Sequence, residues 1–178
     1  RVVRVVDMAP PVITLMGTNP MIVECKSTFE DPGVTAEDNC DSTVSVIASG
    51  NVDTNIVGEY AITYTATDVF GNTSETTRVV QVVDMVPPVI TLIGDNPIIA
   101  ECKSTFTDPG TTVDDACDSA ASVIASGNVD INIVGEYAIT YTATDVFGNS
   151  SETTRVVLVV DTQKPEINLV GANPVILE

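Results

Sequence analysis

Cysteine has the most reactive side chain in this sequence, and it occurs four times, as Cys25, Cys40, Cys102 and Cys117. The chain contains no histidine and no C-x-x-C pair, so a zinc site or a Cys–His nucleophile lacks the residues it would need. Cysteines at a regular spacing are typical of disulfides in exported proteins. We predict the pairs Cys25–Cys40 and Cys102–Cys117, each contributing about 3 kcal/mol by loop closure; the alternative is Cys40–Cys102.

Carboxylates offer the second kind of chemistry. The chain has 25 acidic residues against seven Lys and Arg, which gives a formal net charge of −18. Nucleic acids and anionic membrane surfaces attract a positive field, so both classes of partner are excluded. No stretch of about twenty apolar residues is present, so no membrane insertion is expected in this segment, and an export signal would lie outside it.

The chain is built on an internal repeat of 77 residues. The stretch NIVGEYAITYTATDVFGN occurs at 55–72 and again at 132–149, and only 15 of the 77 aligned positions differ. We predict one domain at 7–83 and another at 84–160, preceded by the last strand of a repeat at 1–6 and followed by the start of a repeat at 161–178. The two partial repeats lack the middle of the unit, so strand donation between molecules is not expected to complete a domain.

Catalysis is not expected in such an array. Carboxylates such as Glu59 and Asp53 could be paired, but glycosidase chemistry needs two acids facing each other across a cleft. The same residues recur in the second repeat, so each domain would need its own active site. We therefore predict that the protein is not an enzyme.

Hydrophobic alternation predicts strands throughout each repeat. In EYAITYTATD, Tyr60, Ile62, Tyr64 and Ala66 share one face of an extended chain, and residues 59–83 are typical of a hairpin. Shorter strands are expected at 12–15, 21–25, 33–37 and 43–48, with a weak one near 51. About seven strands per repeat predict an all-β fold of tandem antiparallel sandwiches. The spacing of Gly58 and Tyr60 suggests that the tyrosine phenol bonds to upstream backbone, the alternative being a half-buried strand aromatic.

An odd number of strands would sort the loops to two ends of each domain. The 38–41 loop would then lie opposite the incoming linker and the 68–72 turn, and close to the next repeat. Five aspartates would meet at that junction, and one hypothesis is that Ca²⁺ binds there and rigidifies it. The alternative is that these residues only begin turns and hairpins or lie in a solvated loop. The five residues are Asp38, Asp41, Asp84, Asp108 and Asp145.

Four motifs, written here as they stand in the first repeat, carry a resemblance to a known family, and the second repeat departs from them at Ala100, Val113 and Ala116. They are PPVITLxGxNPxxVEC, FxDPGxTAxDNCD, GxYxITYTATDxxGN and TRxVxVVD. They resemble bacterial Ig-like tandem repeats of surface and secreted proteins, close to the Ig-like domain of a pesticidal crystal protein and more loosely similar to the hyalin repeat. The resemblance covers each repeat and implies an Ig-like sandwich used as a stalk or adhesion module.

These observations predict an extracellular or cell-surface location and a structural role that gives reach and stiffness to an adhesin, stalk or fibre. The expected partners are neighbouring repeats of the same chain. One alternative is a sandwich that recognises a glycan or a host protein, although the chain has no Trp to stack on a sugar. Another is a subunit of a filament in which copies associate laterally.

Overall fold

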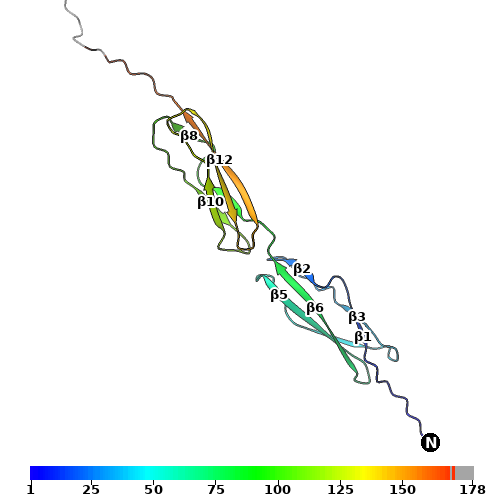
Figure 1. The fold of residues 1–178 in the computed structure, drawn as a ribbon. Helices are drawn as coiled ribbons and strands as arrows, with labels where there is room; N and C mark the ends of the chain where they lie inside the picture. Colours follow the sequence, from blue (N-terminus) through cyan, green and yellow to red (C-terminus); the bar gives the residue numbers. More distant parts are fainter. Residues whose placement is uncertain (169, 171–178) are drawn as a thin grey trace, which may run out of the picture. The chain divides into compact units, whose positions relative to one another are not determined.

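The computed structural model describes residues 1–168 and Val170. All regular elements of this part of the chain are strands, and none is a helix that could span a membrane (Figure 1). Most of the predicted partial repeat at 161–178 lies outside the described residues. The strands of the first repeat are β1 (Val12–Leu15), β2 (Met21–Glu24), β3 (Val34–Glu37), β4 (Ser45–Ser49), β5 (Gly58–Thr67) and β6 (Thr73–Val83).

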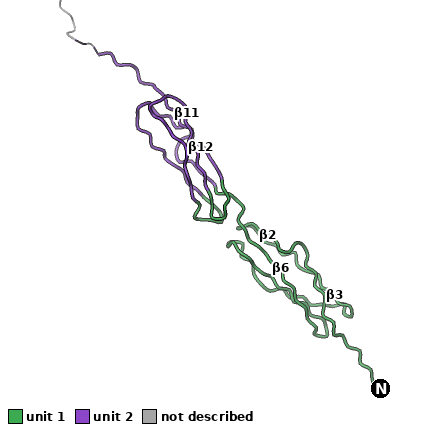
Figure 2. The backbone as a smooth tube through the Cα atoms, viewed as in Figure 1, with its two compact units in different colours: residues 1–88, 114–121, 144–150 green, residues 89–113, 122–143, 151–178 purple. Residues whose placement is uncertain are grey.

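The second repeat has the same six strands, each displaced by 77 residues. They are β7 (Val89–Leu92), β8 (Ile98–Glu101), β9 (Thr111–Asp114), β10 (Ser122–Ser126), β11 (Gly135–Thr144) and β12 (Ser150–Val160). The chain forms two compact units, which are coloured separately in Figure 2. Unit 1 contains residues 1–88, 114–121 and 144–150, and unit 2 contains residues 89–113, 122–143 and 151–178.

Each repeat forms a two-stranded and a four-stranded sheet. In the first repeat, β1 pairs with β3, and the larger sheet has the order β2-β6-β5-β4; the second repeat has β7-β9 and β10-β11-β12-β8. The predicted all-β sandwich is confirmed, with two differences. The strand pairs β2–β6 and β8–β12 are parallel, and each repeat has six strands because the segment predicted near residue 51 is irregular.

Glycine explains why the chain leaves the sheet at that point. Gly50 follows β4 directly and has a φ of +117°, a conformation open to glycine but strained for other residues. A Cβ at this position would lie 2.2 Å from the carbonyl oxygen of Ala61 in β5. The close approach of the two backbones therefore requires a glycine at the end of β4, directly before the irregular segment near residue 51.

The core lies between the two sheets of the repeat. One cluster of buried side chains of the larger sheet consists of Val23, Ile62, Tyr64 and Val80, and Leu15 of β1 and Val34 of β3 pack against it. The burial of β5 alternates residue by residue, with Ile62, Tyr64 and Ala66 inward, as the sequence predicts. The predicted phenol contact is also confirmed, since Tyr60 donates to the carbonyl of Ile56 at 2.8 Å.

A buried arginine, which none of the sequence patterns predicted, closes one end of this core. Arg78 has no exposed surface, and its Nε lies 3.0 Å from Oδ1 of Asp31. Its Nη1 donates to the carbonyl of Thr18 at 2.7 Å, and its Nη2 donates to the carbonyls of Met16 and Gly33 at 2.6 and 3.0 Å. A buried charge is tolerated only when it is paired and hydrogen-bonded in this way.

Arg155 occupies the equivalent place in the second repeat. It is also fully buried, and its Nε lies 3.0 Å from Oδ1 of Asp108. Tyr64 donates its phenol proton to Asp31, and Tyr141 donates to Asp108. The signal in the sequence was the alternation of TTRVVQVV, which puts Arg78 on the same inward face of β6 as Val80 and Val82.

Candidate functional site: cysteine turns and aspartate triads

The cysteines pair differently from the prediction. One disulfide is present in the described part of the chain, and it joins Cys25 to Cys117, which are 92 positions apart and both belong to unit 1. Cys40 and Cys102 are free thiols. The predicted pairs Cys25–Cys40 and Cys102–Cys117 are therefore wrong, and the alternative Cys40–Cys102 pair is not formed within the chain.

The direction of β2 explains the error. β2 runs parallel to β6, and the Cys25 amide donates to the carbonyl of Val83 at 2.7 Å, so Cys25 lies at the end of β6. The loop that carries Cys40 lies at the start of β6, because Asp41 Oδ2 accepts from the Val69 amide at 2.8 Å in the β5–β6 turn. A strand of eleven residues separates these ends by about 35 Å.

The same contact corrects the predicted sorting of the loops. The 38–41 loop was expected at the end opposite the incoming linker and the 68–72 turn. The structure places it with both of them, because Asp7 of the linker, Asp38 of the loop and Asp68 of the turn form one group. Six strands with a parallel pair return this loop to the same end as the turn.

Two groups of three aspartates result, and they occupy equivalent positions in the two repeats. In each group, one carboxylate oxygen from every member lies within 4.8 Å of the others. The linker, the cysteine loop and the hairpin turn each supply one member. The groups, here called aspartate triads, are Asp7–Asp38–Asp68 and Asp84–Asp115–Asp145, and all six residues belong to unit 1.

Backbone amides fix the two loop members of the second triad. Asp145 Oδ1 accepts from the amides of Phe147 and Asn149 at 2.9 and 2.8 Å, and Asp115 Oδ1 accepts from the amides of Cys117 and Asp118 at 2.8 and 2.9 Å. Burial raises the pKa of Asp145, but hydrogen bonds from the Asn149 side chain and from backbone amides outweigh it and hold the pKa below its ordinary value. The turn therefore favours a charged carboxylate.

Asp84, the linker member, is in a different environment. It is 7% exposed, and its Oδ1 accepts from the Val86 amide at 3.2 Å. Its Oδ2 is buried and has no hydrogen-bond partner. Burial raises the pKa of Asp84 first, and the negative charges of Asp115, Asp145 and Glu24 raise it further.

The predicted calcium ligands thus separate into different places. Asp84 and Asp145 share a triad, Asp38 belongs to the other triad, and the remaining two belong to neither. Asp41 fixes its own loop by accepting from Thr43 and Val69, and Asp108 is bound to Arg155. The predicted gathering of all five aspartates is therefore not formed among the described residues, and the triads contain members that the sequence analysis missed: Asp7, Asp68 and Asp115.

A third acidic group consists of Glu24, Asp84 and Cys117. The sulfur of Cys117 is held in the disulfide, so it offers no thiolate to a metal. This group instead shows which carboxylates surround the bridge. It also places the Cys117 sulfur against the end of β2 and the linker.

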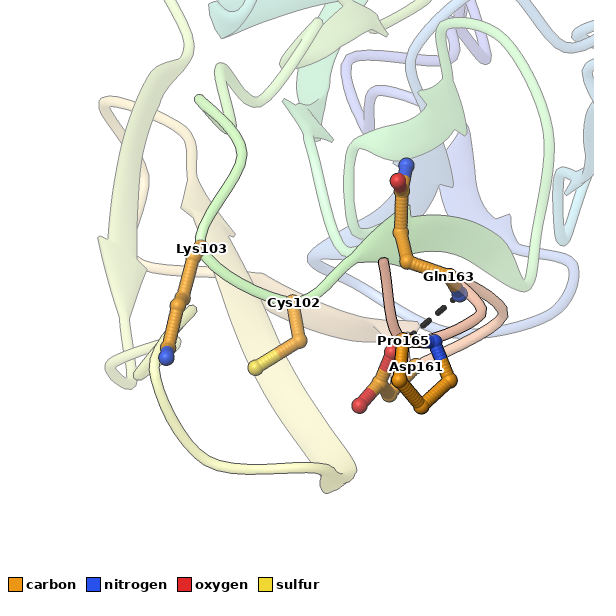
Figure 3. Close-up of a pocket in the computed structure, with 5 residues that line it drawn as sticks. All are labelled: Cys102, Lys103, Asp161, Gln163 and Pro165. Atoms are coloured by element: carbon orange, nitrogen blue, oxygen red, sulfur yellow. Dashed lines mark hydrogen bonds between the residues drawn. The ribbon is translucent and has the colours of Figure 1, made fainter. Parts of the chain in front are cut away.

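The free thiol of Cys102 lies at a pocket of unit 2 (Figure 3). The pocket has a volume of about 350 Å³ and is lined by Cys102, Lys103, Asp161, Gln163 and Pro165. The Cys102 sulfur lies 3.4 Å from the carbonyl oxygen of Asn132. Asp161 Oδ1 accepts from the Gln163 amide at 3.2 Å and so holds the start of the segment that forms one wall.

Comparison with known proteins places both repeats in one family. The sequence model described as "Bacterial surface protein, Ig-like domain" matches residues 13–82 and 90–159. Hyalin of Lytechinus variegatus is 31% identical over 183 residues, which cover 93% of this chain and 34% of hyalin. A sushi, von Willebrand factor type A, EGF and pentraxin domain-containing protein of Rattus norvegicus is 37% identical over 100 residues, 53% of this chain and 3% of that protein. The chain spans about a third or less of these relatives.

Solved structures with a similar arrangement of strands are more distant. The protocadherin GammaB4 extracellular domain has a TM-score of 0.39 at 14% identity, covering 84% of this chain and 33% of its own. Fibronectin(III)-like modules of Clostridium thermocellum CbhA have a TM-score of 0.36 at 15% identity, covering 90% and 100%. These likenesses are too weak to bear on function, whereas the family match covers both repeats: the chain belongs to the bacterial surface protein Ig-like domain family.

Proposed function

We propose that this chain is a non-catalytic structural segment of a bacterial surface or extracellular protein, which extends a stalk, adhesin or fibre. The observation that carries the proposal is the repetition of one complete framework at a spacing of 77 residues. Both copies have the same six strands, the same buried arginine and the same tyrosine contact. A binding or catalytic domain needs one site, whereas a segment that gives length gains from each added copy.

The differences between the copies support the same proposal. A recognition surface would concentrate them on one exposed patch, but they fall on both sheets and reach the core. The buried Val23 of β2 is replaced by the buried Ala100 of β8. Other substitutions lie in β3, in the loop before β4 and at both ends of β6, at positions 34, 36, 37, 43, 44, 73 and 81.

An extracellular location is part of the proposal. Disulfides persist in oxidising compartments and are rare in the cytosol, and the chain contains one between Cys25 and Cys117. The family is described as one of surface proteins. The net charge of −18 would keep a long array soluble and separate from anionic surfaces.

The test asks whether added repeats lengthen the molecule and whether the chain binds glycans. Proteins in which the 7–160 segment occurs once, twice and four times, and which therefore contain two, four and eight repeats, are imaged as single molecules by electron microscopy. The expected contour length rises in proportion to the number of repeats, by about 35 to 40 Å for each repeat. A length that does not rise, or binding of the two-repeat chain to glycans on an array at micromolar concentration, would favour recognition over extension.

A further inference from the structure

We propose that each aspartate triad binds one calcium ion, which gives this chain two equivalent sites. In both triads, three carboxylates from three separate segments bring one oxygen each to within 4.8 Å of the others. Two oxygens that share a Ca²⁺ lie about 2.4 Å from it and hence no more than about 4.8 Å apart. The spacing therefore matches oxygens that share one ion.

An unpartnered buried oxygen is the second observation, independent of the spacing. Asp84 Oδ2 is buried without a hydrogen-bond partner, and Asp7 Oδ2 is in the same condition in the other repeat. A buried carboxylate oxygen without a donor is costly. The unpartnered oxygen belongs to the linker aspartate in both repeats, Asp7 in the first and Asp84 in the second. A cation bound at each triad would give both oxygens a partner.

Charge selects the class of ligand. The ion pairs formed by the described residues are Arg78–Asp31 and Arg155–Asp108, and neither includes a member of a triad. Three carboxylates without a basic partner favour a hard divalent cation. Calcium accepts flexible oxygen sets of six to eight, which three carboxylates and water can supply, whereas Mg²⁺ needs near-ideal octahedral geometry.

The sites are tested by their stoichiometry. Asp38 and Asp115 are each changed to Asn, which keeps an oxygen to accept from the loop amides but removes one negative charge. Isothermal titration with CaCl₂ should give two ions per wild-type chain, one for Asp38→Asn or Asp115→Asn, and none for the double variant. The matched control is Asp130→Asn, because Asp130 accepts from the Asn132 amide at 3.0 Å in an exposed turn outside both triads.

A second measurement uses the wild-type chain alone. Its melting temperature should rise in millimolar CaCl₂ relative to chelator, and the double variant should lose that rise. The proposal is overturned if the wild-type melting temperature is the same in both conditions. It is also overturned if the double variant binds as many ions as the control, or if MgCl₂ produces the same rise at the same concentration.

The geometry also points to an interaction surface at the Cys102 pocket, which accepts the Cys40 loop of a second copy of this chain, with a disulfide between Cys102 and Cys40. The carrying observation is the disulfide of unit 1. A shift of 77 residues maps Cys25 onto Cys102 and Cys117 onto Cys40. The two free thiols are thus the two halves of the bridge that the chain already forms once.

The pocket is the counterpart of the place that the Cys117 loop occupies. In unit 1, the Cys117 sulfur lies within 4.8 Å of carboxylate oxygens of Glu24 and Asp84. Their counterparts are Glu101 and Asp161, and Asp161 lines the pocket. Among the residues that the structure describes, no cysteine loop is bonded at this pocket, and Cys102 is free.

The conformation of the loop suits the same occupant. The Cys40 loop has the sequence Asp38-Asn39-Cys40-Asp41, and the pocket presents its thiol with Lys103 and Asp161. Cys40 is exposed, and its amide donates to Asp38 Oδ1 at 2.9 Å, as the Cys117 amide donates to Asp115 at 2.8 Å. The loop of a second copy therefore has the conformation that its counterpart has in the existing bridge.

Bond formation requires an oxidant, and a small disulfide such as oxidised glutathione supplies it. The Cys102 thiolate attacks that disulfide, forms a mixed disulfide and releases one glutathione thiolate. The Cys40 thiolate of the second copy then attacks the Cys102 sulfur and releases the second glutathione. Two protein thiols are oxidised and one glutathione disulfide is reduced to two thiols.

Complementary variants test the pairing. Cys40→Ser keeps only the pocket thiol free, and Cys102→Ser keeps only the loop thiol free. In a glutathione redox buffer, each variant alone should remain monomeric and their equimolar mixture should form a dimer, with Cys102 joined to Cys40 by peptide mapping. The wild-type chain should form a ladder of longer species on non-reducing gels.

The control separates docking from thiol reactivity. Ser42 is exposed in the same loop, so Cys40→Ser/Ser42→Cys/Cys102→Ser moves the thiol by two residues. This variant should form a dimer with Cys40→Ser at least about tenfold more slowly than Cys102→Ser does, because the disulfide then forms without docking of the loop. Equal rates, or homodimers of either single variant at the rate of the mixture, would overturn the proposal.

Discussion

The two cysteine turns, at Cys25 and at Cys102, have the same backbone and different surroundings. The amide of each cysteine donates to a strand-end carbonyl at 2.7 Å, from Cys25 to Val83 and from Cys102 to Val160. The next residue is a lysine with a φ of +62° in both turns. The sequence of the turn and its own sheet therefore determine its backbone.

The chemistry of the turns differs nonetheless. Cys25 is 5% exposed and bonded to Cys117, whereas Cys102 is half-buried, free and open to a pocket. The difference comes from a loop that is distant in the sequence and present at one turn only. Local sequence thus sets the geometry of these cysteines, and a partner loop sets their oxidation state.

The largest expected effect comes from replacing the buried arginine that the two cores share. Arg78→Met removes the donors to Asp31 and to three carbonyl groups, and leaves Asp31, whose side chain is 24% exposed, without its ion-pair partner. We expect a loss of about 3–5 kcal/mol. Arg155→Met should cost nearly the same, because its distances to Asp95, Ile93 and Gly110 are 2.6, 2.7 and 2.9 Å.

Urea denaturation followed by circular dichroism measures both losses. Arg78→Lys is the matched control, since it keeps the charge but not the planar fork of donors, and it should lose part of the stability. A loss below about 1 kcal/mol in Arg78→Met would contradict a structural role for the network. Unequal losses for Arg78→Met and Arg155→Met would contradict the likeness of the two cores.

The second prediction compares removal of the disulfide with removal of the two free thiols. Cys25→Ser/Cys117→Ser opens a loop of 92 residues and should lower the stability by about 2–4 kcal/mol. Cys40→Ser/Cys102→Ser removes only free thiols and should leave the stability of the monomer unchanged. Denaturant midpoints of both variants, compared with the wild-type chain with and without reductant, check the prediction. An equal loss in the two double variants would mean that Cys25 and Cys117 are not bridged in solution.

Much of the fold could be predicted from the sequence because its signals are local. The alternation of Tyr60, Ile62, Tyr64 and Ala66 predicted β5 and its inward face, and the 77-residue shift predicted a second copy of each strand. The glycine and tyrosine spacing predicted the contact from Tyr60 to Ile56. Each of these follows from residues that are close in the chain.

The site could not be predicted because it depends on strand direction. A hairpin rule makes successive strands antiparallel, but β2 and β6 are far apart in sequence and run parallel. The parallel direction of β2 places Cys25 at the end of β6, whereas Cys40 lies near its start. Asp38, in the loop of Cys40, therefore lies close to Asp68 in the β5–β6 turn. Arg78 was missed for a related reason, since its carbonyl acceptors, Met16, Thr18 and Gly33, lie 45 to 62 residues earlier in the chain.

The third prediction uses a contact that both repeats share. Gly50→Ala would place a Cβ 2.2 Å from the Ala61 carbonyl oxygen, and Gly127→Ala would place one 2.3 Å from that of Ala138. Each should cost more than about 1 kcal/mol by thermal melting, because backbone must move and the positive φ is strained. Gly71→Ala is the control: its φ is +93° with no atom within 4 Å of the added Cβ, so only strain remains and the loss should be smaller.

The smallest expected effect concerns acid stability. Burial raises the pKa of Asp31, but hydrogen bonds from Tyr64 and Gly33 and the charge of Arg78 outweigh it and hold the pKa below the ordinary value of 3.8. A carboxyl whose pKa is lowered by folding stabilises the native state above its unfolded pKa, and this contribution disappears as the pH falls through the folded value.

The stability of the wild-type chain should therefore decline below about pH 4. The Asp31→Asn variant should be less stable than the wild-type chain at neutral pH, and its stability should decline less steeply in acid. Melting curves from pH 7 to pH 2 measure both, with the exposed Glu30→Gln as control; a decline as steep in Asp31→Asn as in the wild-type chain would assign the acid sensitivity to other carboxylates.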